Sequence, residues 1–324
     1  MLTASTNGTS SPTWSWDAID WDDWHTLFQL VPACLGCLGN LVVMAILFPR
    51  KSQNRSTDTL VGHLAVADFL TSVFLLPIPS VRNVPQSWAG FLYCGFIDTQ
   101  SCRLVCIFSS IYILVVICCD RYVAVVYPLQ FNRWLTRGRC TLSIALTWLV
   151  SSVGQFTTTF TSLDISKSVC RLSSGYYSRV IGGSLNFFFV FALPALVMLT
   201  SQLIVAHKLL RKSRRFNSAK NGPSDIPSFH LVARRKVLKM TAIVVAIFVT
   251  TVGPNQTSYF CYNVGIVPRE YLSGEFHRFT FLLACYNSCA NPFIYASQNK
   301  KFREAFFNMW TIWKWPQSRD LPIF

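Results

Sequence analysis

The chain has 324 residues, of which 52% are hydrophobic and only 13% are charged. Soluble domains contain about 25% charged residues, so this composition excludes an ordinary soluble domain. The formal net charge of +15 does not indicate nucleic-acid binding, because the basic residues lie between long apolar segments and form no single basic face. The five histidines are scattered without the spacing of a metal site, and we expect no enzyme chemistry.

Several apolar segments are long enough to cross a bilayer, whose hydrocarbon core of about 30 Å takes roughly 20 helical residues. We therefore predict an all-α membrane protein, built as a bundle of seven transmembrane helices. The predicted spans cover approximately residues 27–48, 58–80, 95–126, 139–161, 179–206, 236–262 and 276–297. Pro194 is expected to kink the fifth span and Pro254 the sixth, because proline cannot donate a backbone hydrogen bond.

The spans divide the chain into three predicted regions. Residues 1–26 form an N-terminal tail, residues 27–297 the transmembrane domain, and residues 298–324 a short amphipathic eighth helix with a tail. Apolar side chains in segment 299–309 fall on one helical face, which favours a helix lying on the membrane surface. The N-terminal tail is polar and acidic and lacks the apolar core of a signal peptide, so we expect the first span to direct insertion.

The distribution of Lys and Arg predicts the orientation in the membrane. The segments 49–58, 121–139, 207–239 and 298–324 contain 22 of the 29 basic residues. Cytoplasmic loops carry an excess of Lys and Arg, so we expect these segments inside the cell and the N-terminus outside, in the plasma membrane. Asn7 begins an Asn-Gly-Thr glycosylation sequon, which agrees with an exterior N-terminus.

Polar side chains deep in a membrane span cost free energy unless they have a partner or a function. The predicted spans carry Asn40, Asp68, Asp120-Arg121-Tyr122, Trp148, and Asn287-Ser288 ahead of Asn291-Pro292-Phe293-Ile294-Tyr295. In this order, these groups resemble the rhodopsin-like G protein-coupled receptors over about residues 27–310. The resemblance implies a receptor that activates heterotrimeric G proteins in response to an extracellular ligand. A transporter is the alternative, but its two halves should be related by a repeat, and none is apparent.

The resemblance also implies an ion site in the middle of the bundle. The residues that match the family's buried sodium pocket are Asp68, Ser110, Asn287, Ser288 and Asn291. A carboxylate, hydroxyls, amides and water can coordinate a small hard cation. The alternative is a polar packing network that holds no ion. We expect no other cofactor.

A second group of matching residues resembles the family's G-protein switch: Asp120, Arg121, Tyr122, Leu129 and Tyr295. In this reading Asp120 holds Arg121 at rest, and on activation Arg121 swings toward the G protein while Tyr295 rotates inward. Leu129 is similar to the apolar plug that enters the G protein. The chain departs from the family at Gln202, where a Tyr is usual, and at Arg234, where many members have a Glu that locks the Arg.

Three residues resemble the family's core connector, which links the ligand pocket to the inner face: Ile111, Pro194 and Phe248. Ordinary core packing is the alternative for Ile111 and Phe248. The familiar Trp two residues before the proline of span six is absent, because Val252 stands there. The resemblance further implies a disulfide between Cys94 and Cys170. Cys94 lies two residues farther from Asp120 than is usual, so either a bulge absorbs them or the helix starts later.

Two ligand classes are excluded by comparison with the family. Amine receptors carry an Asp where this chain has Arg103, and retinal-binding relatives carry a Lys where it has Cys285. Arg103 would pair well with a ligand carboxylate, being always charged and bidentate. Alternatively, Arg103 extends up to the outer water or pairs with Asp98.

The general similarity is greatest to peptide receptors, so a peptide is the expected ligand. The candidate pocket residues are Arg103, Cys106, Ile107, Asn186, Asn255, Tyr259 and Tyr286. A small carboxylate or lipid is the alternative ligand. A non-signalling scaffold is the alternative function, suggested by the missing Trp, Tyr and Glu. The expected partners are the extracellular ligand, a heterotrimeric G protein and membrane lipid, and no nucleic acid.

Overall fold

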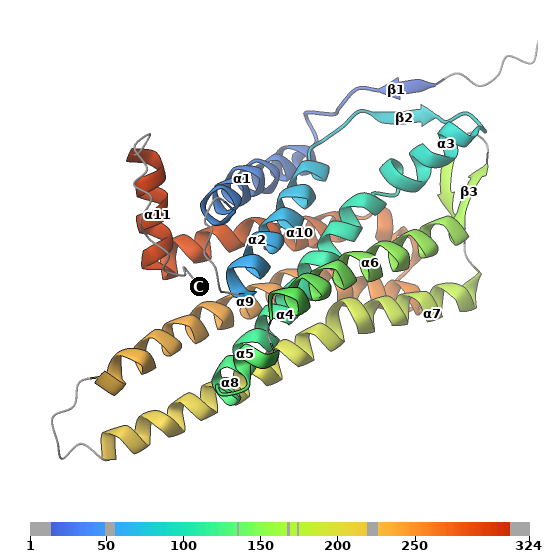
Figure 1. The fold of residues 1–324 in the computed structure, drawn as a ribbon. Coiled ribbons are helices and arrows are strands. Elements are labelled where there is room, and N and C mark those ends of the chain that lie inside the picture. Colours follow the sequence, from blue (N-terminus) through green and yellow to red (C-terminus); the bar gives the residue numbers. More distant parts are fainter. Residues whose placement is uncertain are drawn as a thin grey trace, which may run out of the picture.

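The computed structural model describes residues 14–48, 56–134, 136–166, 169–173, 175–218 and 226–311. Within these ranges, seven long helical segments form an elongated bundle (Figure 1). They are α1 (Trp24–Leu47), α2 (Ser56–Phe74), α4 (Ser101–Val126), α6 (Arg137–Ser162), α7 (Tyr176–Asn186) continued by α8 (Leu193–Ser218), α9 (Ile226–Asn263) and α10 (Glu275–Gln298). The prediction of an all-α membrane bundle is confirmed.

Short elements gather at the two ends of the bundle. One end carries β1 (Ser15–Asp17), β2 (Ser80–Asn83), α3 (Trp88–Tyr93), β3 (Leu163–Ser166) and β4 (Val169–Leu172) (Figure 1). Toward the other end lie α5 (Phe131–Trp134) and the expected eighth helix, α11 (Lys300–Thr311). Strand β1 pairs antiparallel with β2, and β3 with β4. The sequence analysis predicted neither strand pair.

The second predicted span was too long at its far end. Helix α2 ends at Phe74, although the apolar segment runs on to about residue 80. Pro77 and Pro79 follow directly, and each disfavours helical backbone in the residue before it. The chain therefore leaves the helix and continues into β2.

The third predicted span begins later than expected and in a distorted form. A π-helical segment, η1, covers Cys94–Asp98, and Gln100 then adopts a left-handed backbone with φ of 55° before α4 begins at Ser101. A π turn contains more residues than an α turn. Both alternatives left open by the sequence therefore occur, because the chain bulges at Cys94 and the regular helix starts after the break.

The fifth span also contains a π-helical segment. Segment η2 (Phe187–Ala192) joins α7 to α8 directly before Pro194. The ring of a helical proline clashes with the carbonyl four residues earlier and leaves that carbonyl without its donor. The wider turn accommodates the clash, so the expected distortion at Pro194 takes the form of a π segment.

Five of the described segments are long and apolar enough to cross a membrane: Trp24–Leu47, Trp88–Val126, Arg137–Ser162, Tyr176–Arg211 and Leu238–Asn263. Helices α2 and α10 are not among them, because buried polar residues such as Asp68 and Asn291 lower their hydropathy. Both pack between other helices, α2 against α1 and α4, and α10 against α9 and α1. Large apolar side chains such as Leu38 and Leu142 are exposed on the outer surface, as expected for helices that face lipid.

Helix α1 approaches α10 closely at Gly39 and α2 closely at Gly36. A Cβ atom at Gly39 would lie 2.9 Å from Cγ of Pro292, and one at Gly36 would lie 2.9 Å from Cβ of Ser72. Small residues allow this close approach, which supplies much of the packing between helices in lipid. The position of α1 therefore depends on the absence of side chains at these two sites.

We predict that Gly39→Val lowers the thermal midpoint of the purified receptor, because the new side chain forces α1 away from Pro292. Overpacking of this kind costs about 1–3 kcal/mol. Gly154→Val is the matched control, since a Cβ at Gly154 meets nothing within 4 Å. An equal effect of the two substitutions on the unfolding temperature would contradict the prediction.

Candidate functional site

A buried polar cluster at one end of α4 joins Arg121 to its neighbours. Arg121 Nη2 lies 3.1 Å from Asp120 Oδ2 in a salt bridge. The hydroxyl of Thr57, at the start of α2, donates to the same Asp120 oxygen at 2.9 Å and accepts a hydrogen bond from Arg121. Asp120 is buried, with 0% of its side chain exposed, and Arg121 has 16% exposed. The three side chains hold the α4 end against α2, and we call them the Arg121 cluster.

The sequence analysis missed Thr57. The one available signal was a hydroxyl residue in the first turn of α2, at the same predicted membrane face as Asp120. The other proposed switch residues lie around the same end of the bundle. The ring of Tyr122 packs on Tyr127 at a centroid distance of 6.1 Å, and Leu129 is 97% exposed in the turn that follows α4. The side chain of Arg234 lies outside the described residues.

Gln202 stands where the family usually has a tyrosine. Its side chain is buried on α8, and Nε2 donates to Sγ of Cys118 at 3.7 Å. Cys118 lies three residues before Arg121 on α4, so Gln202 faces the helix that carries the Arg121 cluster. The Oε1 atom of Gln202 is buried without a hydrogen-bond partner in the described structure.

The second polar cluster lies in the middle of the bundle and surrounds Asp68 of α2. The carboxylate is fully buried and accepts hydrogen bonds from Ser110 Oγ of α4 and Asn291 Nδ2 of α10, each at 2.7 Å. A further side-chain hydrogen bond comes from Ser288. One carboxylate therefore ties together α2, α4 and α10.

Asn40 extends this network to α1. Its Nδ2 atom donates to the backbone oxygens of Gly36 at 3.0 Å and of Ser288 at 3.1 Å, while Oδ1 is buried without a partner. Asn287 is buried on α10, but within the described residues no hydrogen bond joins its side chain to Asp68. The structure thus brings together four of the five predicted ion-site residues through hydrogen bonds, with Asn40 as an addition.

The three core-connector residues lie in the interior of the bundle. Ile111, Pro194 and Phe248 are all buried. Phe191, in η2, lies over Phe248 with ring centroids 5.9 Å apart. A Cβ atom at Gly253 would lie 3.0 Å from the Phe191 ring, so this ring occupies space next to α9. An aromatic residue of η2 therefore fills the region near Val252, where the family's Trp is missing.

Tyr295 of α10 packs against α11. Its side chain is buried, and its ring meets Phe302 of α11 edge-on at 6.1 Å. The residue lies one helical turn beyond Asn291, so the Asp68 network and the α11 contact are on the same helix. A rotation of this part of α10 would alter both.

Comparison with known proteins adds the decisive observation. Residues 39–295 match the family model described as "7 transmembrane receptor (rhodopsin family)". The chain belongs to this family. This rhodopsin-family receptor is 28% identical over 282 residues to galanin receptor 2b of Danio rerio, covering 84% of this chain and 71% of the relative. It is 31% identical over 299 residues to trace amine-associated receptor 9 of Rattus norvegicus, covering 84% and 82%.

The family assignment confirms a multi-pass membrane receptor and not an enzyme. It also removes the transporter alternative. The relatives are named for different kinds of ligand, since a third is the alpha-1A adrenergic receptor of Oryzias latipes, 26% identical over 84% of this chain and 63% of the relative. The names of the relatives therefore do not decide which kind of ligand this receptor binds. That question has to be argued from the residues of the receptor itself.

The end of the receptor opposite the Arg121 cluster is held by a disulfide and by the N-terminal segment. Cys94 and Cys170 form the expected disulfide, which joins η1 to β4 across 76 residues. On β1, the ring of Trp16 packs edge-on against Tyr93 at 6.1 Å, and Asp17 forms an ion pair with Arg82 at 2.6 Å. We call this the disulfide end. The glycosylation prediction at Asn7 lies outside the described residues.

Asp23 fixes the start of α1 at the disulfide end. Its carboxylate accepts a hydrogen bond from the backbone N–H of His25 at 3.1 Å and pairs with Arg278 of α10. Burial acts to raise the pKa of Asp23, but the hydrogen bonds from His25 and Arg278 and the positive charge of Arg278 outweigh it and hold the pKa below its ordinary value. The carboxylate of Asp23 is thereby committed to Arg278.

The candidate pocket residues are only partly brought together at this end. Arg103 lies with its guanidinium carbon 4.7 Å from the ring centroid of Phe281. Asn186 donates to Gln256 at 3.0 Å, and Tyr259 stacks on Tyr262 at 6.2 Å. The remaining candidates are all wholly or partly buried: Cys106, Ile107, Asn255 and Tyr286. The structure joins Arg103 to α10 and Asn186 to α9, but it does not join all seven residues in one cluster.

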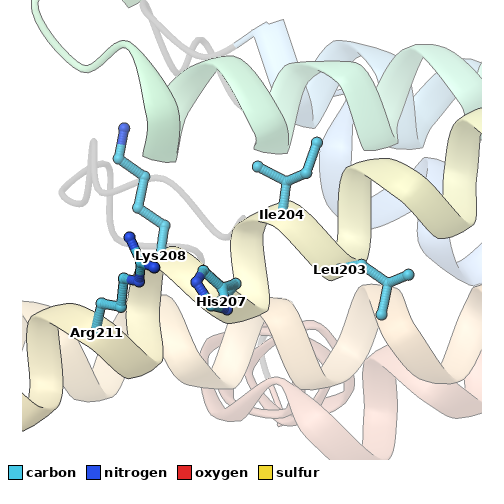
Figure 2. A pocket seen from close by; sticks show the side chains of 5 residues that line it. All are labelled: Leu203, Ile204, His207, Lys208 and Arg211. Atoms are coloured by element: carbon cyan, nitrogen blue, oxygen red, sulfur yellow. The ribbon is translucent and has the colours of Figure 1, made fainter.

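A hollow of about 550 Å³ lies near the opposite end of the receptor, on the surface of α8 (Figure 2). Its lining combines apolar and basic side chains: Leu203, Ile204, His207, Lys208 and Arg211. Lys208 Nζ donates to the backbone oxygen of Val126 at the end of α4, at 2.9 Å. The hollow is thus basic. It lies on the part of α8 that is distant from α7, which carries the candidate ligand residue Asn186.

We predict that Thr57→Val raises basal G-protein activation, because the hydroxyl holds both members of the Asp120–Arg121 pair. A hydrogen bond to a charged group contributes about 1.5–3 kcal/mol, so even partial loss should raise the active fraction about 3- to 10-fold. Nucleotide exchange in membranes from transfected cells measures this effect at matched surface expression. Thr141→Val is the control, since Thr141 bonds only to its own helix at Arg137. Unchanged or reduced exchange would show that Thr57 does not restrain Arg121.

Proposed function

We propose that this chain is a plasma-membrane receptor with its N-terminus outside the cell, which binds an extracellular peptide and drives nucleotide exchange on a heterotrimeric G protein. The observation that carries the proposal is the Arg121 cluster, with its buried Asp120–Arg121 pair and the bridging Thr57. Membership of the rhodopsin family supports both a ligand and a G-protein partner.

The charge distribution supports this orientation. The segments expected inside the cell contain 22 of the 29 basic residues, and two of these, Lys208 and Arg211, line the hollow on α8. The segment 121–139 contains no acidic residue, and the segment 207–239 contains only Asp225. An inner surface of this kind suits contact with the anionic lipids of the cytoplasmic leaflet as well as with the G protein.

The proposed mechanism is a shift between two populations. At rest, Asp120 and Thr57 hold Arg121 in the bundle. A ligand that binds better to the open arrangement offsets the loss of these contacts, and Arg121 is then released toward the G protein. Leu129 is already exposed and would enter the G protein as an apolar contact. The connection between the two ends runs through Phe191, Ile111 and Phe248.

Two observations support a peptide as the ligand. Among the relatives are two receptors named for galanin, which is a peptide. The disulfide end also presents large exposed aromatic side chains on several elements: Trp14, Trp16, Trp88, Tyr176 and Tyr177. Aromatic side chains supply large contact area at peptide and protein interfaces. A ligand amine finds no carboxylate at Arg103, where amine receptors have an Asp.

The mid-bundle network fits a sodium ion. A carboxylate from Asp68 and hydroxyls from Ser110 and Ser288 converge there, and the buried Oδ1 of Asn40 still lacks a hydrogen-bond partner in the described structure. Hard cations prefer oxygen ligands of this kind. We propose that Asp68 and these neighbours hold sodium, which would supply positive charge next to the buried carboxylate and favour the resting packing of α2, α4 and α10.

Removal of sodium should lower the thermal midpoint of the purified receptor, because a ligand that binds the folded state stabilises it by mass action. The measurement replaces sodium chloride by choline chloride at constant ionic strength. Asp68→Asn should abolish the difference between the two salts, while Asp164→Asn, on β3, should preserve it. An equal sodium effect in wild type and Asp68→Asn would rule out this site.

The proposed function is tested by G-protein activation in cells. Arg121→Ala should abolish nucleotide exchange at normal surface expression, because no other side chain replaces the released guanidinium. A screen of peptides on cells expressing the wild-type receptor, with Arg121→Ala as the paired control, should give responses that only the wild type shows. Absence of any G-protein response, basal or peptide-driven, despite surface expression, would favour the scaffold alternative.

A further inference from the structure

Arg103 is a buried cation in the upper part of the bundle. It lies near the start of α4 at the disulfide end, and only 3% of the residue is exposed. A guanidinium stays protonated under all physiological conditions, so this charge is permanent. Removing a charge from water is costly unless other charges or hydrogen bonds compensate. A group that compensates the charge of Arg103 must therefore lie either in the protein or in a bound molecule.

The described part of the chain contains no anionic partner for Arg103. No carboxylate lies within 4.0 Å of it, and the Nε atom is buried without a hydrogen-bond partner. Asp98, the one partner that the sequence suggested within this span, is exposed and forms no ion pair with it. Only 3% of the residue is exposed, so extension to the outer water hydrates little of the side chain. Pairing with Asp98 is thus contradicted, and the outer water compensates only a small part of the charge.

Three carboxylates at the disulfide end are paired with other arginines. Asp17 pairs with Arg82, while Asp23 and Glu275 both pair with Arg278. The Arg103 guanidinium lies over the face of Phe281 on α10, with its carbon 4.7 Å from the ring centroid. An aromatic face stabilises a cation but accepts none of the hydrogen bonds that the five guanidinium N–H groups can donate. The Phe281 ring thus stabilises the charge of Arg103, but it leaves the N–H donors of the guanidinium without an acceptor.

We propose that Arg103 binds an anionic group of the activating ligand, and that this group is a carboxylate. A carboxylate matches the planar guanidinium with two parallel hydrogen bonds and cancels the buried charge. The inference rests on the proposed function, since it names the chemistry of the same ligand. In a peptide, the carboxylate is either the C-terminus or an Asp or Glu side chain, and a small organic acid presents the same group.

The first experiment needs no ligand. Thermal unfolding is compared for purified wild type, Arg103→Met and Arg103→Lys, with Arg82→Met as the control at a paired, exposed arginine. If the charge has no internal partner, Arg103→Met raises the unfolding temperature of the ligand-free receptor, and Arg103→Lys, which keeps the charge, does not. A lower unfolding temperature for Arg103→Met would show that the guanidinium serves the fold, and would overturn the proposal.

The second experiment identifies the source of the carboxylate. Cells expressing wild type, Arg103→Lys or Arg103→Gln are screened with two matched peptide libraries, one with free C-termini and one amidated, and with small aromatic acids and their amides. We expect active compounds to lose about 10- to 100-fold in potency when the carboxylate is converted to an amide. Arg103→Gln should remove this preference, and Arg103→Lys should retain part of it.

The outcomes separate the possible sources and the two proposals. Dependence on the C-terminus, on an acidic side chain or on a small acid each supports the anion site and names its ligand. Equal potency of acid and amide on wild type, or an acid preference that survives in Arg103→Gln, overturns it. If no compound activates the wild type but Arg103→Met is more stable, the peptide function fails while the anion site stands.

Discussion

The constraint that shapes this receptor is that polar groups inside a bilayer must find their partners within the protein. Asp68 meets this constraint with hydrogen bonds from α4 and α10, and Asn40 extends the network to α1. These contacts join helices that have no hydrophobic reason to prefer one another over lipid. The Arg121 cluster meets the same constraint at one end, by tying α4 to α2. The relative positions of four helices thus follow from a few polar side chains.

The sequence predicted the number, order and approximate positions of the long helices, because apolar length and motif order are local properties. It also predicted that Asp68, Ser110 and Asn291 act together, although they are far apart in the chain. It did not predict Thr57, because a threonine in the first turn of a helix is common and nothing local indicates that Asp120 lies opposite. The strand pair of β1 and β2 was missed for a similar reason, since two short segments 65 positions apart at Asp17 and Arg82 carry no periodic signal.

The irregular turns show where sequence reasoning from regular geometry fails. Span lengths were predicted from an ideal rise per residue, but η1 and η2 each place extra residues in a π turn. In η2 this turn brings Phe191 next to Gly253 and above Phe248. The sixth span has Val252 where the family usually carries a Trp, and an aromatic side chain of the fifth span packs against the sixth span one residue farther on, at Gly253.

Strand β1 holds the N-terminal segment against the disulfide end. It is fastened to β2 by backbone pairing and by the Asp17–Arg82 ion pair, and Asp23 anchors the following residues to α10. The rings of Trp14 and Trp16 are thereby ordered on the surface of the folded receptor. A ligand that contacts these rings does not have to order a free tail when it binds, so less of its binding free energy is lost to conformational entropy.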